Sequence, residues 1–200
     1  MSDCQPVFTP MTPGLHLSSS MGPSTPEEIE EMQNMPYLNA VRVLNYLAVA
    51  MCPNIAYAVS CLAHFNSNLG PTHWASVKHL LRYLQGTIDL ALTFAPDPSA
   101  ESFQTWTDAN HGGNLDNGQS TSGFVTKVRT GAISWASKLK NFVTLSTTEV
   151  EFVASVFTGT EIIWLRNLFG ELGSRLEKPS YLYINNLSAL SVAKNPKHHG

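Results

Sequence analysis

The segment "YLYINNLSAL", residues 181–190, joins a short strand to the start of a helix. Aromatic and aliphatic side chains fill Tyr181 to Ile184, as in a strand, and a helical pattern opens near Leu187. Two amides, Asn185 and Asn186, lie at the junction. A polar residue between a strand and a helix is a common position for an active-site group, where an acid could hold a metal ion and an amide holds one poorly. The segment therefore indicates either a site or a site that has been lost.

The sequence before this segment predicts an α/β fold. Three expected strands are separated by short turns rich in Gly and Asn, which favours an antiparallel meander. A long helix, a fourth strand and a last helix follow. The expected strands cover residues 102–109, 120–128, 131–137 and 180–185, and the expected helices cover residues 146–173 and 187–195. This order predicts a mixed sheet with flanking helices over residues 101–200.

The first half of the chain is predicted to be helical. Repeated prolines make residues 1–24 an extended tail, and residues 25–93 form a helical segment. A proline-containing linker, residues 94–101, separates this segment from the sheet. The expected helices begin at the capping box Thr25-Pro26-Glu27-Glu28 and continue over residues 38–51, 55–65 and 72–86, with Thr72 as the cap of the last helix.

The composition fits a globular chain without a general affinity for polyanions. Of its 200 residues, 43% are apolar, and the net charge of −3 gives no global positive field. The cysteines Cys4, Cys52 and Cys61 lack metal-ligand spacing, which favours buried thiols in a reducing compartment. No apolar run approaches the roughly 18 residues of a membrane helix, and the N-terminus does not resemble a secretory signal. We expect an intracellular protein, cytoplasmic or nuclear, with no membrane partner.

Three carboxylates could contribute to a site. Asp108 ends the first strand of the sheet, and Glu149 and Glu151 lie in the first turn of the long helix. At about 100° per residue, the two glutamates point about 160° apart. Glu149 completes a capping box with Ser146, so Glu151 is the acid expected against the sheet. Each acid also has a structural alternative, because aspartates often terminate strands and glutamates often complement a helix dipole. The apolar side of the long helix is expected to include Val150, Phe157 and Trp164.

Local basic groups are the only expected contacts for nucleic acid. Lys78, His79 and Arg82 share one side of the helix over residues 72–86 with His73, and Lys138 and Lys140 precede the long helix. A few phosphate contacts would give weak, salt-sensitive binding. The alternative is that these side chains are only solvated.

Four stretches of the chain match one sequence pattern in series. Residues 36–87 include "NIAYAV" and "RYLQGT". "TWTDANHGG" and "STSGF" are similar to S-D-A-D-W-A-G and S-T-S-G-Y, and "ISWASKLKNFVTLSTTEVEF" is similar to I-S-W-x-S-K-x-Q-x-x-V-x-L-S-S-T-E-A-E-Y. "LYINNLSALSVAKNP" is similar to L-Y-C-D-N-x-S-A-I-x-L-A-x-N-P. The series resembles the C-terminal part of the Pol polyprotein of copia-type LTR retrotransposons.

The resemblance implies a ribonuclease H domain preceded by the helical thumb and connection of a reverse transcriptase. The family hydrolyses the RNA strand of an RNA–DNA hybrid with two Mg²⁺ ions held by carboxylates. For this chain, Mg²⁺ is the expected ion and Mn²⁺ is the alternative. Carried over to this chain, the first acid is Asp108 and the second is Glu151. Asn185 stands at the third position, where the family has Asp. The fourth acid belongs beyond Gly200, so the domain is expected to be truncated at its C-terminus.

Departures from the family pattern predict impaired catalysis with weakly bound metal. Asn185 is neutral, Asn110 replaces a further acid, and the Y-x-D-D motif of a polymerase is absent from the sequence. The expected partners are an RNA–DNA hybrid, bound weakly, and the rest of a Pol polyprotein. Three hypotheses stay open. They are a degenerate ribonuclease H remnant of Pol, a working hybrid nuclease that tolerates Asn185, and a nucleic-acid-binding or scaffold protein that retains the fold.

Overall fold

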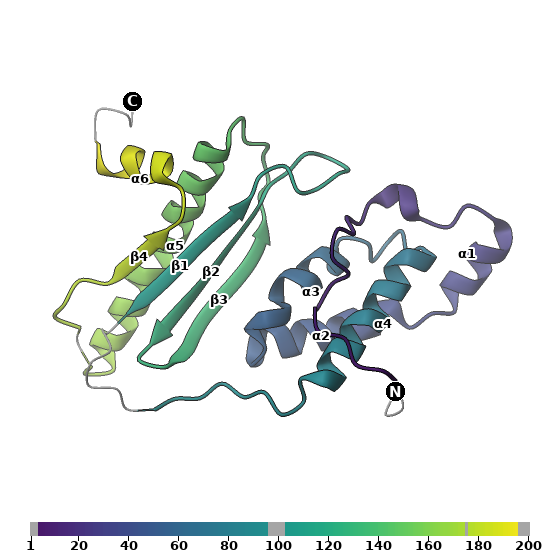
Figure 1. Ribbon diagram of the computed structural model, residues 1–200, viewed down its shortest axis with the longest axis horizontal. Coiled ribbons are helices and arrows are strands. Elements are labelled where there is room, and N and C mark those ends of the chain that lie inside the picture. Colours follow the sequence, from purple (N-terminus) through teal and green to yellow (C-terminus); the bar gives the residue numbers. More distant parts are fainter. Residues whose placement is uncertain (1–3, 96–102, 175, 196–200) are drawn as a thin grey trace. The chain divides into compact units, whose positions relative to one another are not determined.

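The computed structural model describes residues 4–95, 103–174 and 176–195, which form six α-helices and four strands (Figure 1). The chain divides into two compact units. The first comprises the residues up to Ala91 together with Asn114–Gly118, and the second comprises Leu92–Gly113 and the residues from Gln119 onward. The mixed α/β fold expected from the sequence is confirmed, and it is compatible with a ribonuclease H-like architecture.

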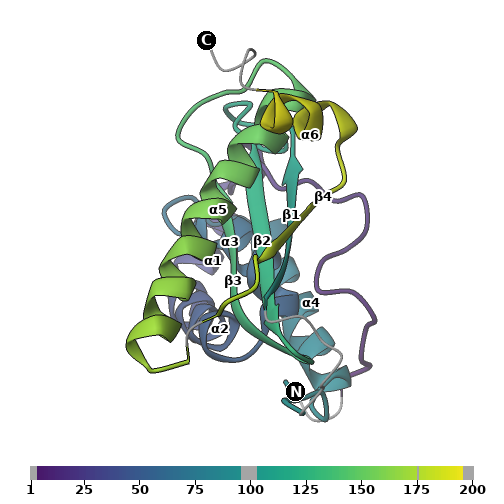
Figure 2. The same ribbon diagram turned by 90° about the vertical axis from the view of Figure 1, so that its left-hand side faces the viewer.

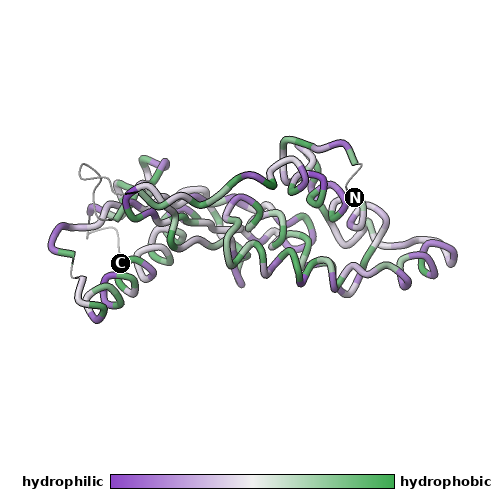
Figure 3. The backbone as a smooth tube through the Cα atoms, turned by 90° about the horizontal axis from the view of Figure 1, so that it is seen from below, coloured by the Kyte–Doolittle hydropathy of each residue, from purple (hydrophilic) through white to green (hydrophobic). Residues whose placement is uncertain are grey.

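The first unit is helical. Its helices are α1 (Pro26–Gln33), α2 (Tyr37–Ala50), α3 (Ala56–Ala63) and α4 (Pro71–Gly86), with the short 3₁₀ turns η1 (Ser19–Met21) and η2 (Pro53–Ile55). Thr25 caps α1 by accepting from the Glu28 N–H, and the Glu28 carboxylate accepts from the Ser24 N–H. Hydrophobic and hydrophilic residues alternate along the helices (Figure 3), as expected where each helix buries one face.

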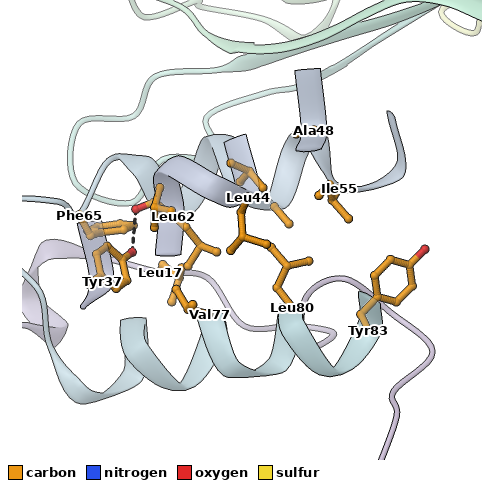
Figure 4. Close-up of a cluster of buried hydrophobic side chains, with 13 residues drawn as sticks. Leu17, Tyr37, Leu44, Ala48, Ile55, Leu62, Phe65, Val77, Leu80 and Tyr83 are labelled. Carbon is orange, nitrogen blue, oxygen red and sulfur yellow. Dashed lines mark hydrogen bonds between the residues drawn. The ribbon is translucent and has the colours of Figure 1, made fainter. Parts of the chain in front are cut away.

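One hydrophobic cluster holds the first unit together. Leu44, Leu62 and Leu80, from α2, α3 and α4, meet in it (Figure 4). The Tyr37 hydroxyl donates to the Leu62 carbonyl at 2.7 Å, so the one polar atom of this buried ring has a partner. Burial of each such side chain stabilises the fold by about 1.5–3 kcal/mol.

The segment before α1 belongs to the same core. Leu17 is buried in the cluster, and Val7, Met11 and Leu15 pack against it. Apart from η1, the described residues of this segment have no regular secondary structure. The segment therefore contributes side chains to the hydrophobic core although it is irregular. Its proline content predicts the irregular backbone and not this packing.

Two expectations about α4 are wrong. The helix begins at Pro71 after the N-cap residue Gly70, so Thr72 is not its cap. His73, expected on the basic side, is buried. Its Nδ1 accepts from the Gly70 N–H at 3.0 Å, and its Nε2 lies 3.2 Å from the Ser18 carbonyl oxygen. Because both ring nitrogens have partners, the imidazole can occupy the core.

The second unit is a four-stranded sheet with two helices. Its strands are β1 (Gln104–Asn110), β2 (Thr121–Val128), β3 (Gly131–Leu139) and β4 (Tyr181–Ile184), and its helices are α5 (Thr147–Glu171) and α6 (Leu187–Lys194). The strand order is β3-β2-β1-β4. β1 pairs antiparallel with β2 and parallel with β4, and β2 pairs antiparallel with β3. Figure 2 shows α5 running along one side of the strands.

Small polar side chains link α5 to the sheet. The Thr158 hydroxyl lies 3.0 Å from the Thr107 hydroxyl of β1 and 2.8 Å from the Ala154 carbonyl oxygen. The Phe157 ring meets Phe124 of β2 edge to face at 5.7 Å. The face of β1 that carries Thr107 is therefore covered by α5, and the side chains that alternate with it point the other way.

Candidate functional site

Asp108 lies near the end of β1, beside the end of β4. Its Cα pairs with Gly123 in β2, and the residue before it, Thr107, pairs in parallel with Ile184, the last residue of β4. In a parallel pair the two chains leave the sheet at the same edge. The register of β4 therefore brings Asn185 next to Asp108.

The two amides that follow β4 have different partners. Asn185 Nδ2 donates to Asp108 Oδ1 at 3.2 Å. Asn186 is the N-cap of α6, and its Oδ1 accepts from the Ala189 N–H at 2.9 Å. Asn186 therefore has a structural role in starting the helix, and Asn185 is the amide at the site.

Glu151 reaches the same position from α5. The helix begins after Ser146, whose hydroxyl accepts from the Glu149 N–H at 3.1 Å. Glu149 therefore belongs to the cap, as the sequence predicts. Glu151 is buried and is hydrogen-bonded to the Ala109 N–H and to the Asp108 carboxyl group.

The surroundings of Glu151 raise the pKa of its carboxyl group. Burial raises the pKa of Glu151 above its ordinary value, and the negative charge of Asp108 raises it further. The Ala109 N–H opposes both effects by stabilising the charged form. One Glu151 oxygen, Oε2, is buried without a hydrogen-bond partner. A cation bound between the two carboxyl groups would satisfy this oxygen and offset the repulsion between their charges.

The structure brings together Asp108, Glu151 and Asn185, the three site residues expected from the sequence. Their polar groups are two carboxyls and one amide. Within the described ranges, no group of three or more His, Cys, Asp or Glu side chains is arranged to hold a metal ion. The amide presents an N–H to Asp108 and so occupies an acceptor that a cation would use. The metal-binding and catalytic roles of the three residues stay predictions.

Known proteins with similar sequences identify the family. No protein-family model and no solved structure matches the chain. The retrovirus-related Pol polyprotein from transposon TNT 1-94 of Nicotiana tabacum is 42% identical over 200 residues, which are 100% of this chain and 15% of that protein. The corresponding polyprotein from transposon RE2 of Arabidopsis thaliana is 33% identical over 199 residues, which are 100% of this chain and 13% of that protein. The chain belongs to the Pol polyproteins of copia-type retrotransposons.

This result confirms the family that the sequence motifs predict. The chain spans only 15% of the length of the first relative and 13% of the length of the second. A third relative is a much shorter protein, and this chain covers most of its length. Secreted RxLR effector protein 161 of Plasmopara viticola is 40% identical over 134 residues, which are 67% of this chain and 94% of that protein. Similar sequence therefore occurs both inside long polyproteins and as most of a short protein.

The basic side chains of the first unit of this Pol chain differ in what they contact. His79 Nε2 lies 2.9 Å from the Thr9 carbonyl oxygen, and Arg82 Nε donates to the Gln5 carbonyl at 2.7 Å. Both side chains are therefore engaged by the segment before α1, whereas Lys78 is exposed. Backbone carbonyl oxygens therefore already bond the nitrogens of His79 and Arg82 that a phosphate would need.

The two lysines of the second unit also differ. Lys138 is exposed on β3. Lys140 Nζ lies 5.3 Å from the centroid of the Phe157 ring, and burial, together with the charge of Lys138, lowers the pKa of Lys140. Binding of nucleic acid by any of the five basic residues stays a prediction.

Sequence reasoning missed two contributors to this part of the Pol chain. The Ala109 N–H bonds Glu151, and a backbone amide leaves no signal in the sequence. Aromatic side chains lie two positions before Asp108 and Asn185, at Trp106 and Tyr183, and their rings stack. The sequence could have indicated this contact, because each of the two expected strands has an aromatic residue two positions before its site residue.

The remaining expectations concern thiols and membranes. Cys4, Cys52 and Cys61 are free thiols and are half-buried. Among the residues that the structure describes, no helix has the length and apolarity needed to cross a bilayer.

Proposed function

We propose that the second unit of this Pol chain is a ribonuclease H domain that is impaired in hydrolysing RNA–DNA hybrids. The single observation that carries the proposal is the hydrogen bond from Asn185 Nδ2 to Asp108 Oδ1. It puts a neutral donor where the family resemblance implies a third carboxylate. The helical first unit would correspond to the thumb and connection that precede this domain in a reverse transcriptase.

The ligands support weak binding of Mg²⁺ or Mn²⁺. Asp108 and Glu151 would hold the ion, and the unpartnered Glu151 Oε2 gives it one buried ligand atom. Asn185 adds at most a neutral oxygen to these two carboxyl groups. Two divalent ions repel each other, so charged ligands are needed to hold both. A bound ion would supply charge stabilisation of the transition state and would activate a water.

The residues of the chain itself have separate tasks in this proposal. Asp108, exposed at the end of β1, faces the substrate. Glu151 is held by the Ala109 N–H and keeps its carboxyl group pointed at Asp108. Asn185 positions the Asp108 carboxylate through one N–H and adds no charge. Loss of one ion should lower the rate on the order of a hundredfold or more, since each 1.36 kcal/mol of transition-state stabilisation is about tenfold.

Cleavage of a labelled RNA–DNA hybrid tests the proposal. The natural chain, Asn185→Asp and Asp108→Asn are compared in Mg²⁺ and in Mn²⁺. We expect little or no cleavage by the natural chain, partial recovery in Asn185→Asp, and none in Asp108→Asn. If the natural chain cuts as fast as Asn185→Asp while Asp108→Asn is inactive, then Asn185 is a working ligand and the proposal is wrong.

A second candidate function is binding without catalysis, as a nucleic-acid-binding or scaffold protein. It is favoured by the hydrogen bonds that satisfy Asp108 through Asn185 and Glu151 without a metal ion. Either function implies an intracellular location, cytoplasmic or nuclear, and contact with the rest of a Pol polyprotein. Fractionation of cells that express the chain would check the location.

A further inference from the structure

The segment before α1 runs along α4 in the opposite direction (Figure 1). The Gln5 carbonyl oxygen accepts from Arg82 Nε at 2.7 Å, in the last turn but one of the helix. The Thr9 carbonyl oxygen lies 2.9 Å from His79 Nε2, almost one turn earlier. Residues 5–12, which we call the N-terminal strap, therefore cross the side of α4 that carries these basic groups.

The other side of the N-terminal strap packs on the core of the first unit. Val7 and Met11, four residues apart, lie against the buried hydrophobic cluster. Phe8, between them, is 98% exposed. No helix or strand includes residues 5–12, so their hold depends on these few apolar contacts and on the hydrogen bonds from α4. A segment held in this way can open without unfolding the rest of the unit.

Gly86, the last residue of α4, allows the N-terminal strap to approach closely. A Cβ built on Gly86 would lie 2.8 Å from the Pro6 Cβ and 3.6 Å from the Val7 carbonyl oxygen. The first distance is shorter than the roughly 3.5–4.0 Å of an ordinary carbon contact, so a larger residue would push Pro6 away. In a helix Gly is less favourable than Ala by about 1 kcal/mol, so the helix itself does not require the glycine.

The bonds to the N-terminal strap leave positive charge on α4. A backbone carbonyl oxygen is neutral, so the Gln5 carbonyl satisfies the Arg82 N–H without compensating the guanidinium charge. Lys78, one turn before Arg82, is exposed and adds a second charge on the same side. A phosphate oxygen carries the negative charge that a carbonyl lacks, and charge-assisted hydrogen bonds are about twice as strong as neutral ones. A polyanion and the strap therefore compete for Arg82.

We propose that the N-terminal strap is an autoinhibitory contact that masks a site for the phosphate backbone of nucleic acid on α4. With the strap in place, only Lys78 of the three basic groups meets a phosphate. With the strap released, Lys78 and Arg82 both meet phosphates, and His79 can donate an N–H. By linkage, a bound polyanion favours release by the same factor by which release favours binding. The inference goes beyond the proposed hydrolysis, because it involves neither Asp108 nor a metal ion.

Binding of a labelled oligothymidylate to the full chain in EDTA, followed by fluorescence anisotropy, tests the inference. Gly86→Ala pushes Pro6 away from α4, and one additional phosphate contact should raise the affinity on the order of tenfold at about 50 mM salt. The slope of log affinity against log salt should steepen from about −0.7 to about −1.4. Arg82→Gln should have little effect in the natural chain but should cancel the gain in Gly86→Ala. Gly170→Ala adds the same methyl group to α5, where nothing lies within 4 Å, and is the matched control.

Chymotrypsin cleavage after Phe8, detected by mass spectrometry, reports release of the N-terminal strap. Gly86→Ala should be cut several-fold faster than the natural chain. Val7→Asn should be cut faster too and should bind more tightly, because it puts a polar side chain against the hydrophobic cluster. An excess of unlabelled oligothymidylate should speed the cleavage of the natural chain, as linkage requires. Circular dichroism shows that each variant is folded.

Two results would overturn the inference. One is a variant that is cut faster after Phe8 yet binds the oligomer no more tightly, since Arg82 would then be released without gaining a phosphate. The other is cleavage of Gly86→Ala and Val7→Asn that is as slow as in the natural chain, since the N-terminal strap would then be a fixed part of the core. Because binding is measured without a metal ion, failure of the ribonuclease H proposal would leave both results unchanged.

Discussion

Replacing Asn185 by Asp puts a third carboxylate beside Asp108 and Glu151. The change removes an N–H donor that lies 3.2 Å from Asp108 Oδ1. Such a hydrogen bond contributes about 0.5–1.5 kcal/mol. Two like charges about 4 Å apart repel by about 1 kcal/mol in water and about 4 kcal/mol at an effective dielectric constant of 20. Because Asp108 and Asn185 are exposed, the lower figure applies. Without a divalent ion, we expect the substitution to lower the free energy of unfolding by about 2 kcal/mol.

Mg²⁺ should reverse this loss. The third carboxylate makes the site a better ligand for the ion, and an ion at a hundred times its dissociation constant stabilises the folded state by about 2.7 kcal/mol. Thermal unfolding in EDTA and in Mg²⁺ measures both effects. In a domain of about this size, 2 kcal/mol corresponds to a shift of about 8–16 °C. We expect Asn185→Asp to melt that much lower in EDTA and to recover in Mg²⁺, while the natural chain changes little.

The neighbouring amide provides the control. Asn186→Asp introduces the same charge one residue away, but Asp caps a helix about as well as Asn does. Its unfolding should stay within about 0.5 kcal/mol of the natural chain, with no dependence on Mg²⁺. The reasoning fails if Asn185→Asp is as stable as the natural chain in EDTA, or if Asn186→Asp shows the same rise with Mg²⁺.

Three further predictions concern single side chains. The raised pKa of Glu151 means that the folded state binds the proton of this carboxyl group more tightly than the unfolded state does, so stability in EDTA should fall as the pH rises above about 4.5. Denaturant titrations of Glu151→Gln should show a weaker dependence on pH. A steeper fall in the variant would contradict the assignment. Leu17→Ala should lower the free energy of unfolding by about 2–4 kcal/mol, whereas Phe8→Ala, at a side chain that is 98% exposed, should leave it within about 0.5 kcal/mol. Lys78→Gln should reduce the salt dependence of polyanion binding by about one phosphate contact. Arg82→Gln should mainly speed proteolysis before residue 25, because Arg82 is bonded to the Gln5 carbonyl. Equal effects of both variants on binding would show that Arg82 is not held by this carbonyl in solution.

The sequence predicts the elements of the sheet unit well because their signals are local. The expected strand at residues 180–185 is Tyr181–Ile184, and the expected helix at residues 146–173 is Thr147–Glu171. Both ends of that helix carry chemistry that the sequence displays, with Ser146 as the cap at its start and Gly173 in the left-handed region (φ 78°) just after its end. Such features need no knowledge of the partners across the fold.

Which side of a helix is buried depends on those partners, and here the sequence misleads. Trp164, expected on the buried side of α5, is exposed, and the small residues Ala154 and Thr158 are buried instead. α5 is apolar on several sides, and small side chains let it approach the sheet closely enough for Thr158 to reach Thr107. The expectation for Glu151 was correct because it rests on the cap at Glu149 and not on the position of Trp164.

Asn185 shows how one amide can favour the fold over the chemistry. Three carboxylates at this edge would repel one another unless divalent ions held them together, so stability would depend on the ion concentration. The amide instead donates to Asp108 and adds no further negative charge beside Asp108 and Glu151. Active sites commonly trade stability for activity, and we infer that Asn185 favours stability at this position. In the proposed function, the substitution that removes a charged ligand also removes a repulsion from the ion-free fold.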